Sequence, residues 1–281
     1  MTGAVAARLS DGRLHLQHGP IDLLIEAFGM PAEVEGAYRQ AADRFSDILP
    51  TLVGELSLLR RPLGDAYPLL RGPVARRMAE AVWPYRDVFI TPMAAVAGAV
   101  ADEVLQAMRA GCVLDKAYVN NGGDIAIHLD PGHSLRAGIF AQALDGAVEL
   151  THDRPVRGIA TSGWRGRSFS LGIADSATVL ATTAAAADAA ATVIANAVNV
   201  DHPAVERRPA RDLDPDSDLV DRPVTIDVGA LPPTLIDKAL ASGAAEARRL
   251  RLCGLIDSAA LSVQGQWWVE TSLQNDRRAV R

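Results

Sequence analysis

The chain has 281 residues, with 28 basic and 34 acidic side chains, a formal net charge of −6 and two cysteines. This length suffices for one large domain or two closely packed ones, and a composition of 49% hydrophobic and 22% charged residues excludes wholesale disorder. The net acidity argues against a general binder of nucleic acid or of anionic membranes, because both require a basic surface.

The cysteines and the hydropathy pattern bear on the cellular compartment. Cys112 and Cys253 lie far apart and lack CxxC spacing, which is typical of buried thiols in a reducing compartment. The first residues show no basic segment followed by a long apolar run, and no apolar stretch reaches the roughly 18 residues of a membrane-spanning helix. We therefore expect a cytoplasmic protein that binds neither nucleic acid nor membrane, and self-association is compatible with the sequence.

The first part of the chain predicts a strand pair followed by helices. Residues 12–28 hold two short extended runs around the turn signal His18-Gly19-Pro20. In residues 33–61 apolar side chains recur at steps of three and four, which predicts a long amphipathic helix with a kink or break at Pro50. This helix could form a coiled-coil dimer, but we expect it to cover the core of its own domain. Next we expect a loop at 62–73, a helix at 73–83 and a helix at 92–110.

The rest of the chain mixes strands and helices without regular alternation. We expect a β-meander at 115–150, a β-rich stretch at 157–181, an alanine-rich helix at 183–200, a strand at 224–228, a helix at 232–250 and strands at 254–263 and 266–271. Residues 201–223 are charged, proline-rich and without periodicity, which predicts a surface loop or linker. Without a regular βαβ repeat, the predicted fold class is α+β.

A first polar constellation is the string Asn120-Asn121-Gly122-Gly123-Asp124 between two apolar runs. Asn and Gly tolerate positive φ, so the string predicts a tight turn whose backbone amides can face a phosphate or the edge of a planar ring. The alternative is a simple hairpin turn.

A second constellation covers residues 160–168, ATSGWRGRS. Arg165 and Arg167 offer forked donors and Trp164 offers a stacking face, which together suit an anion. The alternative is a surface loop with solvated arginines. The sequence contains neither a P-loop nor a GxGxxG fingerprint.

A third constellation lies on the alanine-rich helix, where Asp188, Thr192 and Asn196 occur at i, i+4 and i+8 and therefore share one face. A carboxylate on a buried helix requires a partner, and oxygen ligands suit a hard cation such as magnesium. The alternative is a satisfied buried carboxylate that caps a neighbouring loop. Asp175, in the preceding segment, is a candidate member of the same cluster. The six histidines show no zinc-site spacing.

These constellations, in this order, resemble the ApbE superfamily, known for flavin transferases that attach FMN from FAD to a threonine of a target protein. The closest resemblance is to a shorter cytoplasmic branch of unestablished activity. The strings that carry it are QHGPID (17–22), ITPMAAVAGAVAD (90–102), YVNNGGDIAIHL (118–129), GIATSGWRGRSFSLGIAD (158–175) and ADAAATVIANAV (187–198).

The resemblance implies both a fold and a site. The fold would be a duplicated T-fold-type sheet with helices packed on one face, a single domain over residues 1–273 made of two pseudo-repeats, with a disordered tail at 274–281. In the transferases a VNxGGD string and an ATSG string line the FAD pocket, and an ADxxAT helix supplies magnesium ligands. The flavin-binding residues that match these strings would be Asn120, Gly122, Gly123, Asp124, Ala160, Thr161, Ser162 and Gly163, and the magnesium ligands Asp188 and Thr192. Asn121, Arg165 and Arg167 join the expected flavin-binding residues from the constellations described above.

Two departures from the transferases bear on FMN transfer more than on flavin binding. Ala97 stands where they carry a lysine, and Asp175 is kept without the nearby histidine and Pro-x-Thr-Gly. We expect a cytoplasmic protein that binds FAD or a related phosphorylated ligand with magnesium; if catalytic, it would transfer flavin or cleave the pyrophosphate, with Asp175 as the base. The alternatives are a non-catalytic flavin- or substrate-binding accessory protein for a redox or sulfur-assimilation (homocysteine) partner, and a purely structural remnant of the fold.

Overall fold

The computed structural model describes residues 3–141 and 144–271. Within them, one large antiparallel sheet of nine strands runs through the molecule. In spatial order its strands are β1 (Val5–Arg8), β2 (Leu14–His18), β3 (Ile21–Phe28), β4 (Lys116–Asn121), β5 (Asp124–Leu129), β8 (Gly158–Ser162), β9 (Ser176–Ala181), β12 (Ser258–Val263) and β13 (Gln266–Thr271).

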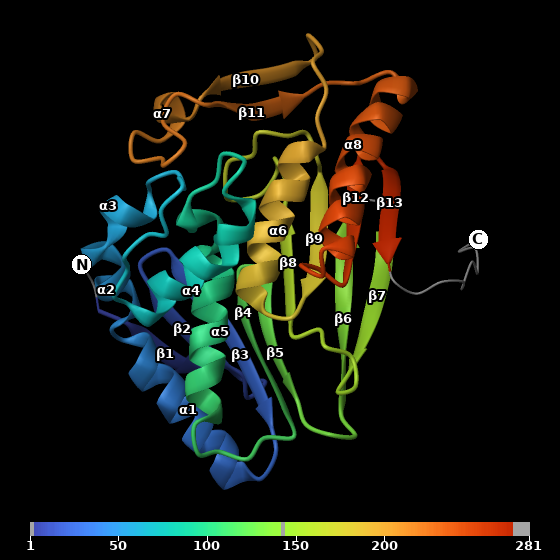
Figure 1. Ribbon diagram of the computed structural model, residues 1–281. Coiled ribbons are helices and arrows are strands. Elements are labelled where there is room, and N and C mark those ends of the chain that lie inside the picture. Colours follow the sequence, from blue (N-terminus) through green and yellow to red (C-terminus); the bar gives the residue numbers. More distant parts are fainter. Residues whose placement is uncertain (1–2, 142–143, 272–281) are drawn as a thin grey trace.

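The long helices cover one face of this sheet (Figure 1). The helices are α1 (Pro31–Phe45), α2 (Ile48–Gly54), α3 (Leu56–Leu59), α4 (Pro73–Val82), α5 (Val96–Arg109), α6 (Ala184–Ala197), α7 (Ala210–Leu213) and α8 (Pro233–Leu252), with 3₁₀ turns at Trp83–Tyr85 and Pro92–Ala95. The order β2-β3-helices-β4-β5 recurs as β8-β9-helices-β12-β13. The predicted α+β class, with a duplicated T-fold-type sheet and helices on one face, is confirmed.

The other face of the sheet is covered in part by a separate hairpin, β6 (Ser134–Ala141) and β7 (Leu144–Thr151). The hairpin packs on the middle of the sheet through a small apolar cluster that contains Ile127, Leu150 and Val156. The meander predicted at 115–150 is therefore only half right. β4 and β5 join the large sheet, whereas β6 and β7 leave it, because a hairpin that packs across a sheet face shows the same alternation as one that continues the sheet.

Two other predictions need correction. The helix at 33–61 breaks at Ser46–Asp47, ahead of Pro50, which lies in the first turn of α2 where its missing N–H costs no hydrogen bond. Residues 201–223 are not a linker, because they contain β10 (Val205–Pro209) and α7, and β10 pairs with β11 (Pro223–Val228) to form a two-stranded arm. The tail at 274–281 lies outside the described residues, and the single-domain boundary stays a prediction.

Helices α5 and α6 cap each other. The Asp102 carboxylate of α5 accepts hydrogen bonds from the N–H groups of Ala184 and Ala185 at the start of α6, at 3.1 and 2.9 Å. The Asp188 carboxylate of α6 accepts one from Gly98 in the first turn of α5, at 3.0 Å. A Cβ at Gly98 would lie 2.3 Å from the carbonyl oxygen of Ala184. Since first-turn N–H groups have no partner within their own helix, each helix satisfies the other's N-terminus.

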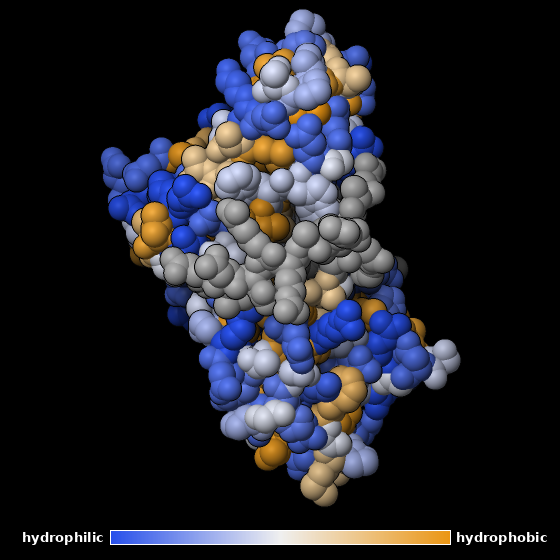
Figure 2. All heavy atoms as spheres, turned by 90° about the vertical axis from the view of Figure 1, so that its right-hand side faces the viewer, coloured by the Kyte–Doolittle hydropathy of each residue, from blue (hydrophilic) through white to orange (hydrophobic). Residues whose placement is uncertain are grey.

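The surface agrees with the composition. On the side that Figure 2 shows, hydrophilic residues dominate and hydrophobic ones are scattered among them. No helix in the described part of the chain combines the length and the apolar character needed to cross a bilayer.

Candidate functional site

A cavity of about 440 Å³ lies between the start of α5, one face of α6, the β4–β5 turn and the loop between β8 and β9. It receives all three polar constellations of the sequence. The predicted site residues that line it are Asn121, Gly122, Asp124, Thr161, Ser162, Gly163, Arg167, Asp188 and Thr192. Asn120, Gly123, Ala160, Arg165 and Asp175 are not among its lining residues.

The α6 wall of the cavity carries the three residues that were placed on one helix face. Asp188, Thr192 and Asn196 all line the cavity. Asn196 is also structural, because its side-chain oxygen accepts the N–H of Leu171 at 2.9 Å and thereby holds the far end of the β8–β9 loop. Asp188 and Thr192 are therefore the two residues of this helix whose side-chain oxygens could ligate a metal in the cavity.

Two carboxylates in the cavity have strongly raised pKa values. Burial raises the pKa of Asp188 well above its ordinary value, and the nearby Asp124 adds to the effect, while the N–H of Gly98 opposes it. Burial raises the pKa of Asp124 to about 7, although the N–H of Thr161 and the positive charge of Arg167 both lower it. The two acids are thus poorly solvated and repel each other, a setting in which a cation is favourable.

The β4–β5 turn divides its two asparagines between the faces of the sheet, as strand alternation requires. Asn121 faces the helices, and its amide donates to the carbonyl of Ala97 at 3.0 Å. Asn120 faces away, and its side-chain oxygen accepts the N–H of Gly123 at 2.8 Å. Gly122 has φ 65°, which strains any residue with a side chain, and a Cβ there would lie 2.1 Å from a terminal nitrogen of the Arg167 guanidinium and would displace this arginine.

The two arginines of the 160–168 string have different surroundings. Arg167 reaches over the glycine turn and lines the cavity. Arg165 instead binds the Asp175 carboxylate at 3.1 Å and stacks on Trp164 at 4.5 Å. The Asp175 oxygens also accept the Trp164 indole N–H at 3.2 Å and the Gln264 backbone N–H at 2.5 Å, so this carboxylate fixes the base of the loop.

Sequence reasoning missed one whole wall of the cavity. This wall consists of Thr91 and Met93 before α5 and of residues 214–219, which follow α7. The Thr91 hydroxyl donates to Asp218 at 2.5 Å and joins the arm to the helical layer. The sequence does mark Thr91, because a threonine before a proline is typical of a helix N-cap. Nothing in the charged segment 214–219 indicates which element this segment contacts.

The donor set fits magnesium in one particular way. Among the described residues no group of three or more His, Cys, Asp or Glu side chains could hold a metal. The cavity does offer the carboxylates of Asp188 and Asp124 and the hydroxyl of Thr192, all of them oxygen donors. Mg²⁺ usually takes one or two carboxylates and completes its octahedron with water and substrate phosphates, so this set suits a metal that is shared with a phosphorylated ligand.

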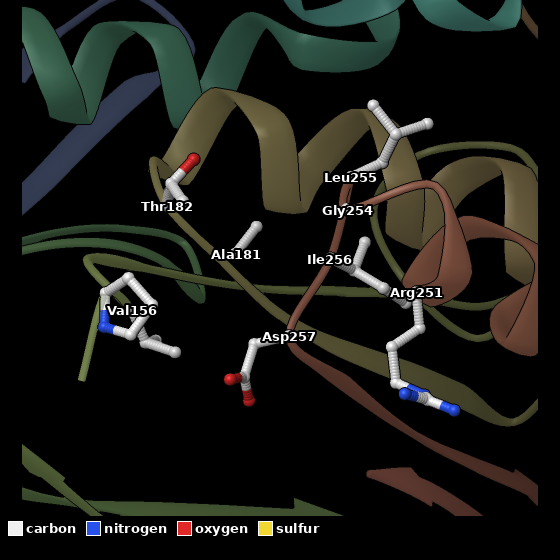
Figure 3. A pocket seen from close by; sticks show the side chains of 9 residues that line it. Val156, Ala181, Thr182, Arg251, Gly254, Leu255, Ile256 and Asp257 are labelled. Atoms are coloured by element: carbon white, nitrogen blue, oxygen red, sulfur yellow. The ribbon is translucent and has the colours of Figure 1, made fainter. Parts of the chain in front are cut away.

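A smaller cavity of about 220 Å³ lies where the end of β9 meets the segment after α8 (Figure 3). Its charged residues are already paired, since Asp257 binds Arg154 at 2.7 Å and Arg251 binds Glu270 at 2.8 Å. It is therefore a weaker candidate than the cavity at α6.

Comparison with solved structures finds distant similarities that span nearly the whole chain. A mutant of the flavin transferase ApbE from Vibrio cholerae is 13% identical, with 96% of this chain and 98% of that chain covered and a TM-score of 0.44. The flavinyl transferase ApbE from Pseudomonas stutzeri, in its apo form, is 13% identical, with 96% and 94% covered and a TM-score of 0.38. Similarity at this level assigns no activity.

Curated relatives are closer in sequence. A UPF0280 protein of Methanothrix thermoacetophila is 42% identical over 134 residues, which are 46% of this chain and 54% of the relative. A UPF0280 protein of Archaeoglobus fulgidus is 40% identical over 131 residues, 45% of this chain and 51% of the relative. The chain thus spans about half the length of these curated relatives. A family model described as "AbpE bacteria" matches residues 6–269. The resemblance read from the sequence strings is confirmed at the level of the family: the chain belongs to the AbpE family of bacteria.

Proposed function

We propose that the cavity at α6 binds FAD, or a related phosphorylated ligand, together with magnesium. The observation that carries the proposal is that two kinds of group line the same cavity. Asp188 and Thr192 present oxygen donors from α6, and the β8–β9 loop presents Arg167 to the same cavity. A phosphate needs positive or N–H donors and magnesium needs oxygen ligands, so one cavity meets both requirements. The flavin part of the proposal rests on the ApbE-like sequence strings.

Each wall has a distinct task in this proposal. Asp188 and Thr192 would hold the magnesium ion, which when bound neutralises charge on the phosphate oxygens. Arg167 would donate to the phosphate, assisted by the hydroxyl of Ser162, whereas the hydroxyl of Thr161 is bonded to that of Thr178 at 2.9 Å. Gly122 leaves the turn without a side chain, so that a ligand can approach its backbone closely.

A second candidate function is a non-catalytic accessory protein that holds flavin or a substrate for a redox or sulfur-assimilation (homocysteine) partner. The observation in its favour is the shortage of free catalytic groups. Ala97 brings no amine to the cavity, and the Asp175 carboxylate is committed to the base of its loop. An enzyme built on this cavity would cleave or transfer at the pyrophosphate, and the role of Asp175 as its base stays a prediction.

Thermal denaturation with added FAD tests ligand binding and the metal site together. FAD with Mg²⁺ is expected to raise Tm by several degrees, because a ligand that binds only the folded state stabilises it, and EDTA is expected to remove most of the rise. Asp188→Asn should abolish the Mg²⁺-dependent part, whereas Asp237→Asn, an exposed change on α8, should leave it intact. If neither FAD nor FMN shifts Tm with or without Mg²⁺, the proposal is wrong. Where FAD does bind, release of AMP from FAD distinguishes an enzyme from a carrier.

A further inference from the structure

A second hollow of about 400 Å³ lies on the opposite side of the sheet from the helices. It is bounded by the outward face of β3 and β4 and by the strand β6 of the hairpin. Its lining residues are Arg13, Leu24, Glu26, Phe28, Lys116, Tyr118, Asn120, Ile125, Leu135, Arg136, Ala137 and Gly138. We call this hollow the hairpin groove.

Strand alternation builds the floor of the hairpin groove. Lys116, Tyr118 and Asn120 occur at every second position of β4, so their side chains leave the same face. The register places Phe28 opposite Lys116 and Glu26 opposite Tyr118. The Lys116 ammonium lies 4.7 Å from the centre of the Phe28 ring and donates to the carbonyl of Ser134 at 3.3 Å. An aromatic surface and a cation are therefore combined at one place.

The hairpin groove carries a surplus of positive charge in a chain whose net charge is −6. It has three cations, Arg13, Lys116 and Arg136, and one carboxylate, Glu26. Arg13 is bound by Asp11 at 2.6 Å. Among the described residues neither Lys116 nor Arg136 forms a salt bridge, and the side chain of Arg136 has no hydrogen-bond partner. The free cations of the groove thus lack an anion from the described part of the chain.

We infer that the hairpin groove is a second ligand site, for a small organic anion that combines a carboxylate or phosphate with a flat apolar part. Arg136 and Lys116 would bind the anionic group, because a guanidinium presents forked donors and an ammonium a point charge. Phe28 and Tyr118 would contact the flat part. Volumes of this order are typical of pockets for small molecules. This site is separate from the α6 cavity and does not depend on the function proposed for that cavity.

The chain offers an unusually clean test, because Lys116 and Lys238 are its only lysines. Pyridoxal 5′-phosphate combines an anion with a flat ring, and its aldehyde condenses with a lysine amine, with loss of water, to an imine that borohydride reduces to a stable amine. At limiting reagent, peptide mass spectrometry should find Lys116 labelled in preference to Lys238, although Lys238, on α8, is the more exposed. Labelling of Lys116 should saturate with reagent concentration, and inorganic phosphate should slow it.

Matched variants and reagents make the outcome decisive. Arg136→Gln should slow labelling of Lys116 by about tenfold, the loss expected for one charge-assisted hydrogen bond. Arg76→Gln removes the same charge from an exposed site on α4 and should change nothing. Asp188→Asn, in the other cavity, should also leave the labelling of Lys116 unchanged. Equal labelling of the two lysines, equal labelling by pyridoxal without its phosphate, or an unaltered rate in Arg136→Gln would each overturn the inference.

Discussion

Arg165 and Arg167 are two residues apart in the chain but act on different partners. Arg167 lines the cavity, whereas Arg165 neutralises Asp175 and stacks on Trp164. Arg167→Gln should therefore weaken binding of FAD by about tenfold, because it removes a charge-assisted donor to phosphate. Arg165→Gln should leave the Kd unchanged and lower stability by about 1 kcal/mol, because the arginine is half exposed and the buried Asp175 carboxylate keeps the donors of Trp164 and Gln264. Isothermal titration of the two variants with FAD and Mg²⁺ compares them, and equal losses would contradict the placement of these side chains.

Asp124 should make the metal-free protein less stable as the pH rises from about 4 to about 7. Burial raises its pKa to about 7 in the folded state, from an ordinary value of 3.8. Between these two values the folded state holds a proton that the unfolded chain has released, so the free energy of unfolding falls with pH and levels off above about 7.

The variant Asp124→Asn isolates this contribution, because asparagine resembles the protonated acid in shape and keeps an oxygen for the N–H of Thr161. Urea denaturation in EDTA should give nearly equal stabilities for the variant and the wild type at about pH 3.5, and a more stable variant at about pH 8. A wild type that matches the variant at both pH values would show that the acid is not protonated in the fold.

At the scale of elements, the crossing of α5 and α6 is set by Gly98. A Cβ there would meet the backbone of Ala184 at 2.3 Å, and backbone cannot rotate away as a side chain can. We expect Gly98→Ala to cost about 1–3 kcal/mol through overpacking, and to weaken the Mg²⁺ response as Asp188 shifts.

Gly54→Ala is the matched control for that change. Gly54 ends α2, and an added Cβ would have no neighbour within 4 Å. This substitution should be neutral or stabilise the fold by up to about 1 kcal/mol, since alanine favours a helix over glycine. Urea unfolding of both variants measures the difference, and equal effects would show that the close crossing does not matter.

The helix faces and strand pairs could be predicted from the sequence because local periodicity determines them. Asp188 and Thr192 share a helix face by their spacing alone, and the structure places both in one cavity. The residues that the sequence misplaced are decided by distant contacts. Arg165 turns away because Asp175 closes the base of its loop, and residues 214–219 reach the cavity because β10 pairs with β11. Neither contact has a local signature.

At the scale of the whole molecule, the reciprocal capping of α5 and α6 joins the two repeats into one cooperative unit. The N-terminus of each helix is satisfied by a carboxylate from the other half of the chain. Urea unfolding should therefore be a single transition in both halves. Trp83 lies in the first half, and Trp164, Trp267 and Trp268 lie in the second. A Trp83→Phe variant reports on the second half by fluorescence, and a variant that keeps only Trp83 reports on the first. Their unfolding midpoints should be equal after correction for their stabilities. Separate transitions in the wild type would contradict this.

The placement of Asn120 and Asn121 on opposite faces of β4 has a thermodynamic consequence. Asn121 lines the α6 cavity, Asn120 lines the hairpin groove, and Asn120 also holds the turn that shapes the cavity. The two hollows are thus separated by the thickness of one strand. If ligands in the two places influence each other, the linkage is reciprocal: each changes the affinity for the other by the same factor.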